Sequence, residues 1–420
     1  MNLKLICCLQ HNRVMFRRRD LKMLISPVID VMEELLEEYR PCFTKPQFQN
    51  FSTYTVGLIT CEGKKNIHAI NRTFMDAKDQ SSLNRFLTES PWDKEKLQNK
   101  RLAIANQTLR TPQSCIGYFL LDDTINNKTG KHMEDAGYHY DSKIGKAVWG
   151  HDIVTTHYVN GEVEYPVGIS LYVKKKTCEQ KKTMFKTKIQ LATEQILAFT
   201  APEGVRIMLA FDCWFFCRQI VDAAKERKWD WVTQADSNRI IHYKGKKTNV
   251  TELAKSLADL RFKKVPVEGK HYALCGLKVW MPKIGDVRLV VSKEEDGFHF
   301  YVSNRLDYSA RQVFLAYKVR HRIEEFYRDV KQNLGLEAYQ MRRGRGAIIH
   351  WHLVFCAHTL LALLKKSAIK ADKRLAKTLA TMGDVCRWLK NQCSRKLVNW
   401  LFQKFKRKAK PENIYRILKI

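Results

Sequence analysis

The chain has 420 residues, of which 45% are hydrophobic and 11% aromatic, and this composition excludes an intrinsically disordered protein. It holds 74 Lys and Arg against 43 Asp and Glu, so its formal net charge is +31. Such a charge is far beyond what solubility requires and indicates a polyanionic partner, with nucleic acid ahead of an anionic membrane surface. The last 80 residues alone carry 20 Lys or Arg against three acids, with aromatic residues between them, which favours contact with phosphates.

The cysteines indicate a reducing compartment. None of the twelve belongs to a C-x-x-C pair, and Cys213 with Cys217 has no partner His or Cys at zinc spacing. We therefore expect reduced, buried thiols. The first nineteen residues contain an apolar run too short for a signal peptide and no small-residue cleavage site, so the sequence predicts a cytoplasmic protein.

Residues 1–110 form the first predicted unit, and their pattern from about residue 20 onward is helical. Ser82 is a candidate N-cap for the helix that ends before Pro91. No strand alternation persists in this region, and it has no clear helix-turn-helix signature. It could serve as a DNA-reading module or as a packing or dimerisation unit.

Residues 111–365 form the second predicted unit, an α/β domain. Its first three strands make a meander, and Asn160-Gly161 marks a tight turn between the last two. A helix, a buried strand, a second helix and another strand follow. The predicted strands are 115–124, 149–159, 165–175, 205–211 and 230–235, and the predicted helices are 185–199 and 217–228.

Between residues 237 and 307 the alternation of helix and strand stops, and a run of β-strands with Gly and Pro turns predicts a β-rich insertion. Ser309 or Asp307 can then cap a long helix. Residues 366–420 form the third predicted unit, a basic helical region.

A membrane assignment competes for one segment, 347–364, which is mostly apolar and is flanked by basic residues. His350, His352 and His358 within it would be costly in lipid, and its length is at the lower limit for a span. We therefore expect a buried core helix and no membrane association. The three histidines do not share one helix face, so they do not predict a metal site.

The most informative segment is the predicted helix 316–331, which would carry Tyr317, Arg320, Glu324 and Lys331 within an arc of about 60°. A carboxylate between cations on one helix face suits a site where a metal ion meets a phosphodiester. The same pattern also fits an ordinary i,i+4 ion pair on a solvated face.

Carboxylates at strand ends supply the rest of the candidate site. Asp122 and Asp123 end the first strand and Asp212 ends the fourth, where open α/β sheets place reactive groups. A lone Asp there is usually a cap or turn former. If the two strands are neighbours and the helix packs over them, Glu324 would complete a three-carboxylate site, and its hard oxygens would select Mg²⁺.

These residues resemble a known family. The spacing Y-x2-R-x3-E-x6-K of Tyr317, Arg320, Glu324 and Lys331 is similar to the YREK signature of DDE transposases of the insertion-sequence-four superfamily. FLLDDT, LAFD and VRHRIEEFYRDVK resemble its three acidic motifs, in order, and the resemblance covers about residues 40–365.

The resemblance implies an RNase H-like catalytic core with a β-rich insertion, preceded by a helical N-terminal domain. It implies cut-and-paste transposition by Mg²⁺-dependent hydrolysis and strand transfer, with Mn²⁺ as a substitute and no small-molecule cofactor. The partner would be double-stranded DNA, both terminal inverted repeats and target, bound by a homodimer. Residues 366–420 would then serve DNA contact, dimerisation or both.

The resemblance also implies residue roles. Asp122 or Asp123, with Asp212 and Glu324, would be catalytic and hold the metal. A D-x-T reading selects Asp122, which we favour, and an alignment on the Asp beside Thr124 selects Asp123. The DNA-binding residues would be Tyr317, Arg320, His321, Arg328 and Lys331.

One departure from the family concerns His321, which stands where hairpin-forming members carry Trp to stabilise a flipped base, so a DNA hairpin step is not part of the prediction. The competing hypothesis is a domesticated or inactive sequence-specific DNA-binding protein derived from a transposase.

Overall fold

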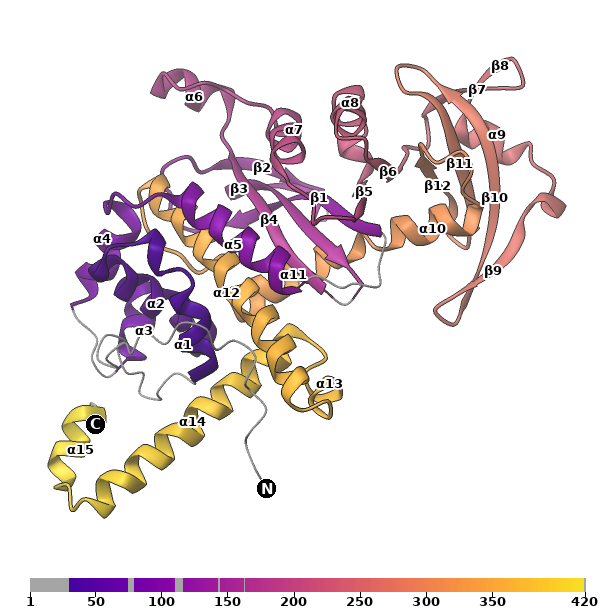
Figure 1. The fold of residues 1–420 in the computed structure, drawn as a ribbon. Coiled ribbons are helices and arrows are strands. Elements are labelled where there is room, and N and C mark those ends of the chain that lie inside the picture. The colour runs from indigo at the N-terminus through magenta and orange to yellow at the C-terminus, as the bar shows by residue number, and fades with distance from the viewer. Residues whose placement is uncertain (1–29, 75–78, 110–115, 143, 162, 419–420) are drawn as a thin grey trace.

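The computed structural model describes residues 30–74, 79–109, 116–142, 144–161 and 163–418 (Figure 1). The N-terminal part is helical, as the sequence predicts. Its helices are α1 (Asp30–Glu37), α2 (Lys45–Thr60), α3 (Ile67–Arg72), α4 (Gln80–Thr88) and α5 (Lys94–Leu109). The predicted N-cap Ser82 is wrong, because α4 begins after Asp79 and Ser82 lies in its first turn, bonded to Asn50. Polar residues fill that extra turn, so apolar periodicity did not reveal it.

The second part is built on a mixed sheet. Its strands are β1 (Ile116–Asn127), β2 (Gly137–Asp141), β3 (Lys146–Asn160), β4 (Val163–Tyr172), β5 (Arg206–Phe211) and β6 (Asp230–Gln234). β3 pairs antiparallel with β1, β2 and β4, whereas β1, β5 and β6 are mutually parallel neighbours. The predicted meander is therefore present, and Gly161 makes its turn with a φ of 63°. The order β4-β3-β1-β5-β6 is consistent with an RNase H-like core.

The predicted run of strands after β6 is also present. It comprises β9 (Lys263–Val267), β10 (Lys270–Met281), β11 (Gly285–Glu294) and β12 (Gly297–Ser303). The hairpin of β7 (Ile240–Tyr243) and β8 (Lys246–Asn249) and the short helix α9 (Val250–Lys255) precede it and were not predicted. β12 pairs antiparallel with β6, with Ser303 opposite Val232. The insertion consequently extends the same sheet to twelve strands.

Helices cover both faces of the central strands (Figure 1). α7 (Lys188–Ala198) and α8 (Arg218–Glu226) lie on one face, after the short α6 (Lys175–Lys181). α11 (His321–Asn333) and α12 (Gly344–Ala371) lie on the other. α13 (Leu375–Thr378), α14 (Met382–Lys406) and α15 (Pro411–Leu418) follow, and α14 extends away from the body.

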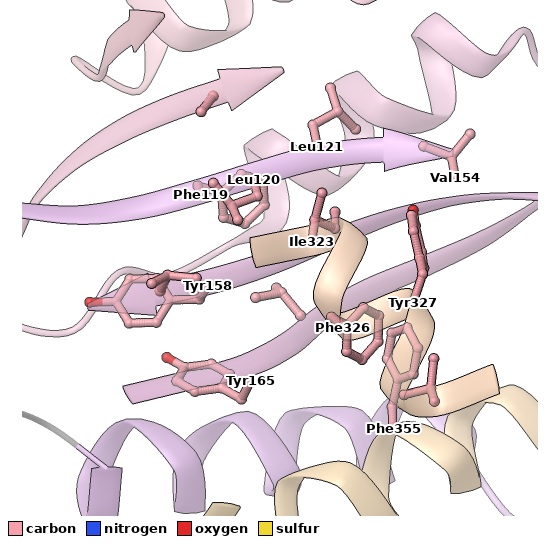
Figure 2. Close-up of a cluster of buried hydrophobic side chains, with 14 of the residues drawn as sticks. Phe119, Leu120, Leu121, Val154, Tyr158, Tyr165, Ile323, Phe326, Tyr327 and Phe355 are labelled. Carbon is pink, nitrogen blue, oxygen red and sulfur yellow. The ribbon is translucent and has the colours of Figure 1, made fainter. Parts of the chain in front are cut away.

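The core between the sheet and α12 is filled by α11 (Figure 2). Ile323 and Phe326 of α11 are at most 1% exposed, and Phe326 meets the ring of Phe355 in α12 at 5.5 Å between centroids. Tyr327 directs its hydroxyl to Thr155 Oγ1 of β3 at 2.6 Å. This packing fixes α11 against β1 and β3, so side chains at its first turn are held at the sheet.

The apolar segment 347–364 lies in α12. By length and composition this helix could cross a membrane, but 89% of its most apolar window is buried inside the structure. It packs against β4, α5 and α2, and His350 is hydrogen-bonded to the Tyr54 hydroxyl at 2.8 Å and to the Gly335 carbonyl at 2.9 Å. A buried imidazole with both nitrogens hydrogen-bonded, as in His350, is typical of a protein core. The expectation that this segment is a buried core helix is thus confirmed.

Candidate active site

The predicted helix 316–331 is two helices. α10 (Ala310–Lys318), capped by Ser309, ends one residue before Val319, and α11 begins at His321. Between them the backbone tightens into i→i+3 hydrogen bonds, from Arg320 N to the Tyr317 carbonyl at 2.9 Å and from Ile323 N to the Arg320 carbonyl at 3.1 Å. The prediction of one continuous face was therefore wrong. Tyr317 belongs to α10, and its hydroxyl donates to Gln234 of β6.

Arg320 lies at this junction and is the centre of the site. Its Nη1 donates to Asp122 Oδ2 at 3.0 Å, and its Nη2 donates to Glu324 Oε1 at 2.5 Å. The second oxygen of Glu324, Oε2, lies 3.0 Å from His321 Nδ1. Both carboxylate oxygens of Glu324 are thus engaged by neighbouring cationic or imidazole groups.

Asp212 ends β5, the parallel neighbour of β1. Leu121 is paired with Phe211, so the next residues, Asp122 and Asp212, are neighbours across the two strands. The prediction that Asp122 and Asp123 end the first strand was wrong, because β1 continues to Asn127 through its pairing with β3. Asp212 Oδ1 accepts hydrogen bonds from Trp214 N at 3.0 Å and from Phe215 N at 3.4 Å, and so it caps a short 3-10 turn. The sequence folds this way because a β-strand of buried apolar residues stops at a residue that can accept from the following amides.

Burial raises the pKa of Asp122 to about 7, opposed by the Arg320 guanidinium and reinforced by the negative charges of Asp212 and Asp123. Burial also raises the pKa of Asp212, which Arg320 lowers and Asp123 raises further. Desolvated carboxylates that repel one another need a cation to remain charged together. Arg320 supplies that charge in this structure.

Asp123 points to the opposite face of β1 from Asp122, as successive strand residues do. Its Oδ2 is 2.6 Å from Lys188 Nζ of α7, and the same Nζ is 2.5 Å from Asp152 Oδ2 of β3. His139 Nδ1 lies 3.4 Å from that Asp152 oxygen. The structure therefore brings Asp122, and not Asp123, to the Arg320 face.

The predicted DNA-binding cations occupy different surroundings. Lys331 Nζ lies 2.8 Å from Glu337 Oε1 and 3.3 Å from the carbonyl of Ile125, near the end of β1. Arg328 does not join the carboxylates; it is 3.6 Å from Glu325 and lines a separate cavity of about 670 Å³ between α11, α12 and α14. The Arg328 side chain turns toward Glu325, and the position of a residue around the helix axis does not predict that contact.

Sequence reasoning missed Lys188, Asp152, His139 and Trp214. Lys188 is the cation between Asp123 and Asp152, and its Nζ lies 5.2 Å from the centre of the Trp214 ring. Trp214 is 54% exposed although it stands two residues after Asp212. A tryptophan two residues after a strand-ending Asp was the available signal for Trp214. No local pattern could reveal the Lys188 network, because Lys188, Asp123 and Asp152 come from three separate segments.

In this structure the three candidate acids are not close enough together to share one metal ion. Within the described ranges, the one group of three potential ligands whose atoms all lie within 4.8 Å of one another is Glu294, Asp296 and His299, a half-buried cluster around the β11–β12 turn. The oxygens of Asp122, Asp212 and Glu324 are farther apart than that. Arg320 contacts two of these carboxylates directly.

Comparison with known proteins places this chain in a family. A model described as DDE superfamily endonuclease matches residues 38–257, slightly more than half of the chain, and one described as Transposase DDE domain matches residues 189–360. A "Probable transposase for insertion sequence element IS701" from Microchaete diplosiphon is 27% identical over 148 residues, which are 35% of this chain and 38% of that relative. The matched stretch thus spans well under two thirds of the relative. With a matching DDE endonuclease model over half its length, the chain belongs to the DDE superfamily of endonucleases.

Proposed function

We propose that this protein is the transposase of an insertion sequence, which it moves by cut and paste, and that it belongs to the YREK group of the insertion-sequence-four superfamily. The observation that carries the proposal is the arrangement of Asp122, Glu324 and Asp212 around Arg320: two acids are bonded to its guanidinium, and the third is close enough for Arg320 to lower its pKa. The family match and the similarity to a probable insertion-sequence transposase support it.

The acids fit a divalent metal ion. All their donor atoms are hard oxygens, which Mg²⁺ prefers, and Mn²⁺ accepts the same ligands. The pKa values of Asp122 and Asp212 are raised by burial and by acidic neighbours, a condition that a bound cation relieves. Asp122, Asp212 and Glu324 would hold the ions. When bound, such ions activate the attacking water or 3′-hydroxyl and neutralise charge at phosphorus.

The other residues act by position and charge. Asp122 is proposed as the first acid rather than Asp123, because Asp123 is held on the other face by Lys188. Tyr317, Arg320 and Lys331 would contact the phosphates of the transposon end, with His321 beside Glu324. Arg328 would bind DNA only outside the carboxylate site, since it lines the separate cavity.

The proposed partner is double-stranded DNA bound by a homodimer in the cytoplasm. Residues 1–110 and 366–420 would flank an RNase H-like domain at 111–365, and the net charge of +31 suits a long phosphate contact. The exposed aromatic residues Phe402 and Phe405 on the extended part of α14 suit the proposed role of the C-terminal region in DNA contact or dimerisation.

An excision assay tests the proposal. A plasmid carrying the gene with its flanking DNA, out to any short inverted repeats, is expected to lose the element when the wild-type protein is expressed, but not with Asp212→Asn. The second candidate, an inactive DNA-binding derivative, predicts no excision with either protein and equal binding by both.

A further inference from the structure

Arg320 holds the carboxylates that the proposed function assigns to the metal. Its two terminal nitrogens bind one oxygen each of Asp122 and Glu324, and the side chain is only 16% exposed. His321 takes the other oxygen of Glu324 at 3.0 Å. An ion approaching these ligands therefore meets a guanidinium of like charge and oxygens that are already engaged.

We propose that Arg320 keeps the metal site closed until a phosphate of bound DNA takes over its guanidinium, so that DNA binding and metal binding promote each other. This inference rests on the proposed function and adds how that site is regulated. It assigns Arg320 two alternative anionic partners, the carboxylates in the free protein and a phosphodiester in the complex.

The chemistry of the exchange is balanced in charge. A guanidinium binds carboxylate and phosphate with the same two-pronged geometry, so a phosphodiester can replace the carboxylates without leaving Arg320 unpaired. The released oxygens of Asp122 and Glu324 are then free to bind a divalent cation, which compensates the repulsion that Arg320 no longer screens. If DNA binds without a metal ion, Asp122 and Glu324 are left without a cation. If the metal ion binds without DNA, the Arg320 guanidinium is left without an anion.

Such coupling is reciprocal. If DNA raises the affinity for the metal by some factor, the metal raises the affinity for DNA by the same factor, and coupled sites typically show factors of about 5 to 150. Each direction of the coupling can be measured with the full-length protein without any cleavage.

The chain offers a matched control in Arg322. It lies on the same first turn of α11, and its guanidinium binds Glu164 of β4 at 2.8 Å and Glu325 at 3.4 Å, away from the three acids. Arg320→Gln and Arg322→Gln remove the same charge and a similar ion pair. Only the first removes the cation that blocks the proposed metal ligands.

The test measures Mn²⁺ binding by the electron paramagnetic resonance signal of free Mn²⁺, with and without a 30-base-pair duplex, after subtraction of Mn²⁺ bound by the duplex alone. We expect the duplex to strengthen Mn²⁺ binding to the wild type by at least about fivefold. We expect Arg320→Gln to bind Mn²⁺ at least about fivefold more tightly than the wild type without DNA, with little further gain from DNA. Arg322→Gln should resemble the wild type.

The inference is overturned if the duplex leaves wild-type Mn²⁺ binding unchanged, or if both variants strengthen it equally, which would be a general charge effect. The wild-type comparison decides the matter even if Arg320→Gln fails to fold. Thermal unfolding in EDTA adds a second readout: Arg320→Gln should melt lower than wild type and recover on addition of Mn²⁺. DNA-independent Mn²⁺ binding with intact cleavage would refute this inference alone, whereas coupled binding without any cleavage would refute the proposed function alone.

Discussion

Asp122 and Asp123 are adjacent in the sequence, and each forms an ion pair, with Arg320 and Lys188 respectively. Replacing either residue by Asn keeps its size and removes its charge, so the two variants can separate an effect on catalysis from an effect on stability. Asp122→Asn leaves Arg320 with Glu324, and Asp123→Asn leaves Lys188 with Asp152. Each variant loses one charged hydrogen bond with a side chain that is at most 21% exposed. The expected cost is roughly 1.5–3 kcal/mol of unfolding free energy for Asp123→Asn. Asp122→Asn should cost less, because removing its charge also relieves the burial and the repulsion that raise its pKa.

Cleavage should separate the two variants. Because Asp122 lies on the Arg320 face, its loss should lower DNA cleavage at least about 100-fold, which is typical when charge stabilisation at the reacting centre is removed. Asp123→Asn should keep cleavage within a few-fold of wild type. Lys188→Met should destabilise the fold more than either, by about 3–5 kcal/mol, because it leaves Asp123 and the fully buried Asp152 without their cation.

The assay is urea unfolding of each variant, followed by nicking of a duplex that carries the end of the element with Mg²⁺ present. An unfolding cost for Asp122→Asn no larger than that for Asp123→Asn, with cleavage lost only in Asp122→Asn, supports the reasoning. Loss of cleavage in Asp123→Asn with its retention in Asp122→Asn would refute it.

Three further predictions concern separate parts of the molecule. Trp214 is 54% exposed two residues after Asp212, so it is placed to stack on a base of DNA bound at the site. Trp214→Ala should therefore weaken binding of an end-containing duplex by about 5- to 150-fold, the range for losing one base-stacking contact, as measured by fluorescence anisotropy. Trp280→Ala removes a 44% exposed tryptophan on the insertion and should have little effect; equal effects of the two substitutions would contradict stacking by Trp214. Phe326 is 1% exposed, so Phe326→Ala should lower the free energy of unfolding, measured in urea, by about 3–5 kcal/mol. Phe402 is 56% exposed, and Phe402→Ala should change that free energy by less than about 0.5 kcal/mol. Similar losses in the two variants would argue against the packing in Figure 2. Burial lowers the pKa of Lys128 to about 7. Between that value and its ordinary value near 10, the unfolded state holds more protons than the folded state, so the free energy of unfolding should rise with pH. Urea unfolding at pH 7 and pH 9 should show this rise, and Lys128→Met should reduce it; the same rise in the variant would rule out Lys128 as its source.

Much of the sheet could be predicted because its strands are short apolar runs bounded by turn residues. β5, with its buried run before Asp212, and the Asn160-Gly161 turn are local signals of this kind. β2 was missed because it is a five-residue strand, GYHYD, whose pairing with β3 defines it more than its own composition. Edge pairing of this sort depends on tertiary context.

The helix break at Arg320 was missed for a similar reason. Residues 316–331 contain no Gly or Pro, so intrinsic propensity favours one helix. In the fold, packing of α10 on β12 and of α11 on β1 places the two helices in different positions, and the turn between them lets Arg320 reach Asp122. The choice between Asp122 and Asp123 likewise depends on which face of β1 packs against α11, and that packing cannot be predicted from the local sequence.

The most direct measurement of the central claim follows cleavage and binding in the same preparation of Glu324→Gln, which keeps the size of the side chain and removes its charge. With a duplex carrying the element's end and Mg²⁺, the wild-type protein should nick the DNA at the end. Glu324→Gln should bind the duplex with affinity within a few-fold of wild type and nick it at least about 100-fold more slowly. Equal nicking by the two proteins would contradict an active centre built from Asp122, Asp212 and Glu324.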